Sequence, residues 1–214
     1  GFTTGNTEYL SIKEFFRLDY IAKKSNYFLV GNYHIKKSDS ARIINQGFMH
    51  LRGIRNVSDR FSVELFLQKE FSEFIDLNDR KLVGGGGRIN LVKYQSKDTL
   101  RSFHIFCGIG VMYEAEVYDT DPENTEKNLL RSTNYLTMKW NVNDKIEVSN
   151  VTYFQPAFER FRNFRIVSEL NLDILIIKKV YFSVDFAMRY DNEPVTKVEK
   201  YDISINNGLR FTIP

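Results

Sequence analysis

The sequence has little cysteine, little proline and no long apolar run. Its one cysteine, Cys107, cannot form a disulfide within the chain, and only 4 of the 214 residues are proline. Proline interrupts the hydrogen-bonded ladder of a sheet, so its scarcity permits long strands. No segment approaches the ~20 apolar residues that a membrane-spanning helix requires. A chain of this composition that crosses a membrane would have to cross it with strands.

A strong excess of one charge is missing as well. The 30 basic and 27 acidic residues give a formal net charge of +3, and no basic run is interleaved with aromatics that could stack on bases. We therefore expect no nucleic-acid partner. The opening Gly1-Phe2-Thr3-Thr4 lacks the basic and apolar segments of a signal peptide, and we expect that peptide to be removed before this numbering begins.

Aromatic residues and strict alternation are what the sequence does contain. The 18 Phe and 12 Tyr favour strands. Between Val180 and Asp191, apolar side chains take every second position and mostly polar ones lie between them. The same period recurs in eleven segments, at about 7–22, 27–37, 41–55, 60–72, 80–94, 100–117, 129–140, 145–155, 162–176, 179–191 and 199–213. Each segment is predicted to be a strand with one apolar and one polar face.

The connections between these segments alternate in length. Short ones near 23–26, 56–59, 95–99, 141–144 and 177–178 alternate with mostly longer ones near 73–79, 118–128, 156–161 and 192–198. The connection at 36–40 belongs to the longer set by its place in the alternation, but it is itself short. Outer-membrane barrels have short turns on the periplasmic side and longer loops outside the cell. This pattern places the C-terminus on the periplasmic side.

Strand length and number together predict the fold. Several segments reach the ~9–11 residues that a tilted strand needs to cross a bilayer. Antiparallel closure requires an even count, so Phe2-Thr3-Thr4, followed by a hairpin turn at Gly5-Asn6, is predicted to end a twelfth strand. The prediction is one all-β domain over 1–214, an antiparallel up-and-down transmembrane β-barrel of about 12 strands. A soluble lipocalin-like barrel is the alternative, with its apolar faces pointing inward and three or four segments unplaced.

Ionised residues fall on the face opposite the apolar one. A charge facing lipid at mid-bilayer costs about 2–4 kcal/mol, so these residues are predicted to line the lumen as a network of paired charges. The network comprises Arg88, Glu114, Lys139, Glu147, Arg165, Glu169, Asp173, Asp185 and Arg189. Glu14 is an exception, because it shares a face with Leu10, Ile12 and Phe16. We expect it near a rim, at a bulge or in a contact.

No motif predicts catalysis, a metal or a cofactor. Gly84-Gly85-Gly86-Gly87 lacks the Lys-Ser/Thr and helix of a phosphate loop; we expect it to permit sharp curvature or an aromatic ring lying on the backbone. His34, His50 and His104 have no carboxylate or cysteine at ligand spacing. Ser102 and His104 share a face, but it is the predicted lumenal one, where a lipid substrate could not reach them.

Four charged residues flank the predicted 192–198 loop: Asp191, Glu193, Lys200 and Asp202. They predict either a salt-bridged mouth of this hairpin or a recognition surface at the cell exterior. Surface ion pairs are individually weak, so the sequence leaves both interpretations open.

Short motifs in a fixed order resemble a known family. They are Ser149-Asn150-Val151-Thr152-Tyr153-Phe154-Gln155-Pro156, Asn163-Phe164-Arg165, Ser168-Glu169-Leu170, Arg189-Tyr190-Asp191-Asn192-Glu193-Pro194, Lys200-Tyr201-Asp202 and Gly208-Leu209-Arg210-Phe211, with Thr4-Gly5-Asn6-Thr7-Glu8 at the start. The chain resembles, best over 129–214, the domain-of-unknown-function family described as salt-induced outer-membrane proteins. The resemblance implies a signal-exported β-barrel in the bacterial outer membrane with no established activity.

Three functions stay open. The favoured one is a non-enzymatic structural component or narrow channel whose charged lumen is largely filled. The second is an accessory barrel subunit that binds another outer-membrane protein. The third, a lipid-modifying enzyme, requires an outward-facing catalytic cluster that the sequence does not offer. Outer-membrane lipid is the expected partner in all three.

Overall fold

One antiparallel sheet contains all the long elements of the chain. The computed structural model describes residues 2–3, 9–38, 41–97, 100–120, 122–195 and 198–211. The strands are β1 Phe2–Thr3, β2 Tyr9–Ile21, β3 Ser25–Ser38, β4 Ala41–Asn56, β5 Phe61–Ser72, β6 Leu77–Gln95, β7 Ser102–Tyr118, β8 Thr125–Asn141, β9 Ile146–Pro156, β10 Phe164–Ile177, β11 Val180–Asp191 and β12 Tyr201–Phe211, with a 3-10 turn η1 at Glu73–Ile75. Nowhere in these ranges is there a helix that could cross a membrane.

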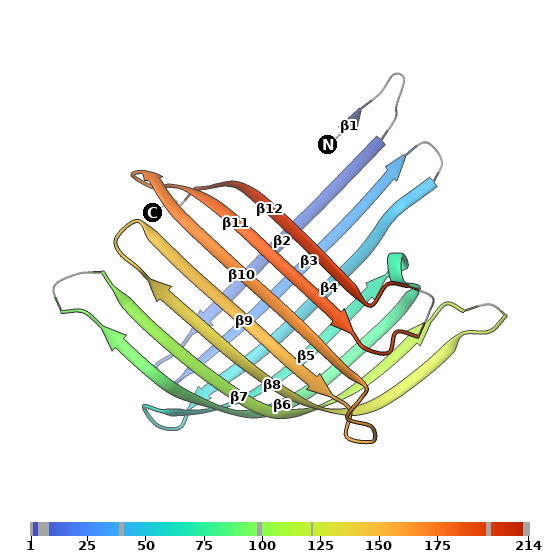
Figure 1. Cartoon of the computed structure of the whole chain (residues 1–214), viewed down its shortest axis with the longest axis horizontal. Helices are drawn as coiled ribbons and strands as arrows, with labels where there is room; N and C mark the ends of the chain where they lie inside the picture. The colour runs from blue at the N-terminus through green and yellow to red at the C-terminus, as the bar shows by residue number, and fades with distance from the viewer. Residues whose placement is uncertain are drawn as a thin grey trace.

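The strands pair in chain order, each antiparallel to the next, in a 12-stranded sheet. This confirms the predicted up-and-down fold, including a twelfth short strand at the N-terminus. The predicted Gly5-Asn6 turn lies outside the described residues. Figure 1 shows the sheet curling round, so that β9–β12 and β2–β5 lie on opposite sides of an interior.

The first and last strands remain separate in the described part of the chain. β12 pairs with β11 from Tyr201 to Phe211, and no pairing joins β12 to β1 or β2. All of β12 is exposed, and so is nearly all of β2. The described sheet is therefore a curled barrel wall with two edges.

The connections alternate in length in the C-terminal half. The 178–179 turn and the 142–145 connection lie at one end, and the longer 157–163 and 192–200 connections lie at the other. Over the N-terminal half the contrast is weak, because 39–40 is short and 96–101 is as long as 119–124. The alternation in connection length, which predicted a periplasmic C-terminus, is therefore clear only in the second half of the chain.

The glycine run allows the sheet to bend tightly between β5 and β7. A Cβ at Gly86 would lie 2.3 Å from the carbonyl oxygen of Ile109, and one at Gly84 would lie 2.5 Å from the ring of Phe66. The ring of Phe61 lies over Gly87 in the same way. The prediction that these glycines admit aromatic rings against the backbone is confirmed.

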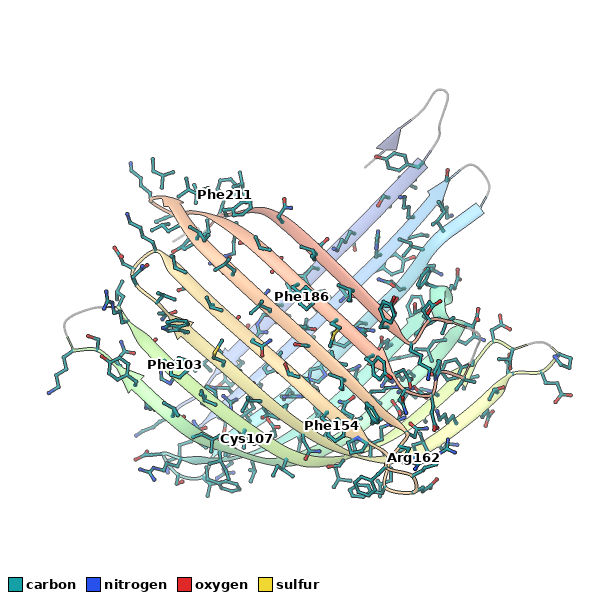
Figure 2. All side chains as sticks on the ribbon, viewed as in Figure 1. Phe103, Cys107, Phe154, Arg162, Phe186 and Phe211 are labelled. Atoms are coloured by element: carbon teal, nitrogen blue, oxygen red, sulfur yellow. The ribbon has the colours of Figure 1, made fainter. Side chains whose placement is uncertain are left out.

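The convex face is apolar over most of its area. Leu65 on β5 and Ile205 on β12 are 74% and 66% exposed, and both belong to the alternating apolar set of their strands. Side chains stand off both faces of the strands, and Phe103, Phe154 and Phe211 on the convex face are labelled in Figure 2. Exposed apolar surface on this scale is what hydrocarbon covers in a membrane barrel.

Aromatic pairs gather near both ends of the strands on this convex face. Tyr20 stacks on Tyr27 and Phe103 packs edge-on against Trp140 near the short turns. Phe164 packs against Phe154 and Tyr190 near the opposite ends. The ten residue steps from Phe103 to Tyr113 span roughly 33 Å of strand, or roughly 25 Å along the membrane normal at a tilt of about 40°. Transmembrane barrels have an apolar band of this height between two aromatic girdles.

A polar patch interrupts the convex face on β8–β10. Its members are Ser132, Asn134, Asn150, Thr152 and Ser168, and they hydrogen bond chiefly to one another and to backbone. The Thr152 and Ser168 hydroxyls are 2.9 Å apart, and Asn150 donates to the carbonyl oxygen of Glu169 at 3.0 Å. These bonds reduce the cost of turning polar groups toward an apolar medium.

Candidate functional site in the lumen

The candidate site lies on the concave face of the sheet. Side chains on this face form ion pairs between strands that are not neighbours. Arg189 on β11 lies 2.6 Å from Glu70 on β5, and Arg165 on β10 contacts Glu114 on β7. Such pairs form across the interior of the curled sheet, which we call the lumen.

A buried ion cluster fills one part of the lumen. It consists of Glu70, Arg80, Glu114, Glu116, Arg131, Arg165, Arg189 and Asp191. Glu114, which is 0% exposed, contacts Arg80, Arg131 and Arg165. Arg165 also reaches Glu116 and Asp191, at 2.7 Å each. Arginines and carboxylates are equal in number, so the cluster is formally neutral.

Arg131 ties this cluster to the 157–163 connection. Its guanidinium donates to the carbonyl oxygens of Gln155 and Asn163, at 3.1 and 3.2 Å, and to the side-chain oxygen of Asn163 at 2.9 Å. Arg131 is fully buried and Asn163 nearly so. The connection between β9 and β10 is therefore held over the end of the lumen by a charged anchor.

Apolar side chains close the space beside the cluster. Phe66, Leu82 and Met112 form a small buried group on the concave face of β5, β6 and β7. Together with the ion cluster they occupy the lumen along these strands. Removing one member of a buried charged network leaves the others unpaired, which costs about 3–5 kcal/mol.

A second group of charges lies elsewhere in the lumen, and we call it the basic group: Arg17, Arg88 and Lys139. The Arg88 guanidinium lies 3.9 Å from the ring centre of Phe106. Lys139 lies opposite His104 in the pairing of β7 with β8, and the His104 ring stacks on that of Phe106. Arg17 pairs with Asp19 at 2.7 Å. Over the described ranges, no carboxylate forms an ion pair with Arg88 or Lys139.

Acidic side chains line the wall formed by β9, β10 and β11. Arg210 on β12 lies 3.0 Å from Asp173 and 3.8 Å from Glu147. Asp185 accepts a hydrogen bond of 2.5 Å from Asn171. The predicted network is thus divided: Glu114, Arg165 and Arg189 are in the ion cluster, Arg88 and Lys139 are in the basic group, and Glu147, Glu169, Asp173 and Asp185 are on this acidic wall.

The charges that flank the 192–198 loop have different partners. Asp191 belongs to the ion cluster, and Asp202 pairs in register with Arg189. Glu193 forms an ion pair with Arg160, which links the 192–200 connection to the 157–163 connection. The backbone carbonyl of Lys200 accepts a hydrogen bond from Asp191 at 2.7 Å.

The histidines are held by separate neighbours. His50 stacks between phenylalanine rings and its Nδ1 lies 3.0 Å from the side-chain oxygen of Gln68. His34 lies near Ser11, and His104 stacks on a phenylalanine ring. Ser102 accepts a hydrogen bond from Asn141 at 3.0 Å. In the part of the chain that the structure describes, no group of acidic, His and Cys residues could hold a metal.

Half of the ion cluster was not predicted from the sequence. Glu70, Arg80, Glu116 and Arg131 were missed. The signal for three of them was present, because Arg131 lies eight residues from Lys139, Arg80 eight from Arg88 and Glu116 two from Glu114, each pair in one strand. The two-residue period places such residues on one face.

Residues 1–213 match the profile of the family described as "Protein of unknown function, DUF481". A crystal structure of the porin NanC, in a rhombohedral form, is similar at 9% sequence identity and a TM-score of 0.47, over 95% of this chain and 99% of that one. A likeness at this level says nothing about function. No curated protein matches the chain.

Proposed function

The chain belongs to the DUF481 family, whose function is unknown, and we propose that it is a non-enzymatic β-barrel of the bacterial outer membrane that acts as a narrow channel. The apolar convex face and its two aromatic girdles support the membrane location. The concave face supports the channel, because it carries ionisable groups along most strands and includes exposed ones such as Arg210 and Glu147.

The single observation that carries the proposal is the ion cluster. It joins β5–β8 to β10 and β11 across the lumen; five of its eight members are buried, while the Arg189 side chain is 53% exposed. A lumen filled in this way admits water and small ions at most around the cluster. The same contacts also hold the strands of the barrel wall together. A barrel that conducted no ions at all would therefore have a purely structural role.

Planar bilayer recording of the purified, refolded protein tests the channel. We expect small, steady unitary currents in KCl and no passage of sugars in a liposome swelling assay. Outer-membrane fractions from cells that express the chain should contain it in a heat-modifiable, folded form. Large currents with free sugar passage would contradict a filled lumen, and recovery in the soluble fraction would contradict the membrane location.

A second candidate, an accessory subunit that binds another outer-membrane protein, is favoured by the convex face. Glu14 lies mid-strand on this face of β2, exposed and opposite Tyr33. A carboxylate facing hydrocarbon is costly unless a donor meets it. The polar patch on β8–β10 offers further groups for a protein contact. Purification in mild detergent tests this: a stoichiometric companion that is lost in Glu14→Gln would support it.

A further inference from the structure

Arg52 reaches across the middle of the lumen. It projects from β4 and is almost fully buried. Its guanidinium carbon lies 5.1 Å from the ring centre of Phe66 on the neighbouring strand β5. The same atom lies 5.8 Å from the ring centre of Tyr135 on β8 and 6.0 Å from that of Tyr153 on β9. Because β4 does not pair with β8 or β9, these contacts form across the interior.

Glu64 on β5 provides the counter-charge of Arg52. The Glu64 side chain is 4% exposed and that of Arg52 is 10% exposed. Glu64 Oε2 and Arg52 Nη1 are 3.7 Å apart, which is too long for a direct hydrogen bond. A buried ion pair repays the cost of removing its charges from water only when further hydrogen bonds complete it. The two charges are therefore matched, but the hydrogen bonding between them is incomplete.

Three buried polar atoms around this pair make no hydrogen bond of good geometry with any described residue. They are Arg52 Nε, Glu64 Oε2 and Tyr135 Oη. Buried polar atoms almost always have a partner, which is either protein or ordered water. A donor, an acceptor and a hydroxyl supply the two to four polar partners that a buried water needs. Water between the charges would also bridge the 3.7 Å gap.

This pair forms a second layer of the lumen, on the same face as the ion cluster. Tyr135 is four residues from Arg131 on β8, and Glu64 is six residues from Glu70 on β5. An even separation places each of these pairs on one face of its strand, and four residues span roughly 13 Å. In both strands the second layer lies nearer the short connections, at 142–145 and 57–60. A solute that passed the ion cluster from the long connections would meet Arg52 and Glu64 next.

We propose that Arg52 and Glu64 hold water between them in the lumen, and that this hydrated pair is the constriction that sets the ion preference of the channel. The inference rests on the proposed function and deepens it, because it names the residues that a permeating ion meets. The aromatic rings around Arg52 hold its guanidinium in place by cation–π contact and leave the Nε–H group free for water. Glu64 attracts a passing cation and repels an anion, and Arg52 does the reverse.

The first test compares the ion preference of the wild-type barrel with those of Glu64→Gln and Arg52→Gln. The matched controls are Glu193→Gln and Arg160→Gln, which each remove one charge from the exposed pair that joins two long connections. Heat-modifiable migration in gels shows that each variant has folded. The reversal potential of each barrel is then measured in a KCl gradient across a planar bilayer.

The two substitutions should shift the ion preference in opposite directions. We expect Glu64→Gln to raise the permeability ratio of chloride to potassium about threefold or more, and Arg52→Gln to lower it by a similar factor, because each removes a charge of one sign from a low-dielectric passage. Both controls should keep the wild-type ratio. A folded Glu64→Gln or Arg52→Gln barrel that keeps the wild-type ratio would overturn the constriction.

The second test needs no substitution. A crystal structure of the wild-type barrel in detergent, at a resolution that shows ordered water, examines the hydrated pair directly. We expect water within about 3.2 Å of both Arg52 Nε and Glu64 Oε2. A direct hydrogen bond between the two side chains, with no water between them, would contradict the hydrated pair.

The outcomes separate this inference from the channel itself. A barrel that holds the water but passes no current would contradict the channel, and with it the constriction, while keeping the water site. A barrel that conducts with the wild-type ion preference in both variants would keep the channel and contradict the constriction.

Discussion

Glu114 is the residue on which the ion cluster depends most. It is completely buried and contacts Arg80, Arg131 and Arg165. Glu114→Gln keeps the shape but removes the charge that these arginines share. We expect the free energy of unfolding to fall by about 3–5 kcal/mol, because buried cations are left without their counter-charge. Urea titration of the barrel in lipid vesicles, followed by its migration in gels, measures the loss.

Glu193→Gln is the matched control for this substitution. Glu193 also pairs with an arginine, but the Arg160 side chain is 65% exposed and that of Glu193 is 30% exposed. An exposed ion pair contributes about 0–1 kcal/mol. Equal losses in the two variants would mean that Glu114 is less important to the barrel than its burial indicates.

Gly86 and Gly208 form a second matched pair. A Cβ at Gly86 would lie 2.3 Å from the carbonyl oxygen of Ile109 and 2.6 Å from the Cα of Gly110, whereas one at Gly208 meets nothing within 4 Å. Gly86→Ala must push β6 away from β7, and we expect a loss of about 1–3 kcal/mol or more from this overpacking. Gly208→Ala should be neutral or slightly stabilising. Refolding yield in vesicles measures both, and similar yields would contradict the tight bend.

Among the strands, β12 offers the cleanest test of which face meets lipid. Ile205 belongs to its apolar face and the adjacent Ser204 to its polar face. An arginine facing lipid at mid-bilayer costs about 2–4 kcal/mol, and one facing the lumen costs little. Ile205→Arg should therefore reduce the folded fraction in vesicles far more than Ser204→Arg. The reverse order would mean that the apolar side chains point inward.

The strands themselves could be predicted because their period is local. The segment expected at 179–191 is β11 at Val180–Asp191, and the one expected at 41–55 is β4 at Ala41–Asn56. Pairing order followed as well, since short connections join neighbours in an up-and-down barrel. The candidate site was harder to predict, because its members meet only when the sheet curls, as Glu70 on β5 meets Arg189 on β11.

The two-residue period of β6 is interrupted near its N-terminal end. The pairing of β6 with β7 shifts between Leu77 and Asp79, so Leu77 lies opposite Tyr118 and Arg80 opposite Glu116. This bulge places Leu77 and Arg80 on one face although they are three residues apart. A two-residue period counted from Leu77 assigns Arg80 to the wrong face, whereas the same period counted from Arg88, eight residues further on, assigns it to the lumenal face. A bulge of this kind leaves no clear mark in the sequence, whereas the curvature at the glycine run does.

The orientation of the whole barrel follows from its two ends and can be measured directly. In outer-membrane barrels the longer connections face the cell exterior, so the 192–200 connection should be outside and the 178–179 turn in the periplasm. The native Cys107 is first replaced by serine. In that background Glu193→Cys should react with a membrane-impermeant maleimide on intact cells, and Lys179→Cys only after the cells are lysed. The opposite pattern would invert the barrel, and labelling of both residues on intact cells would place neither end in the periplasm.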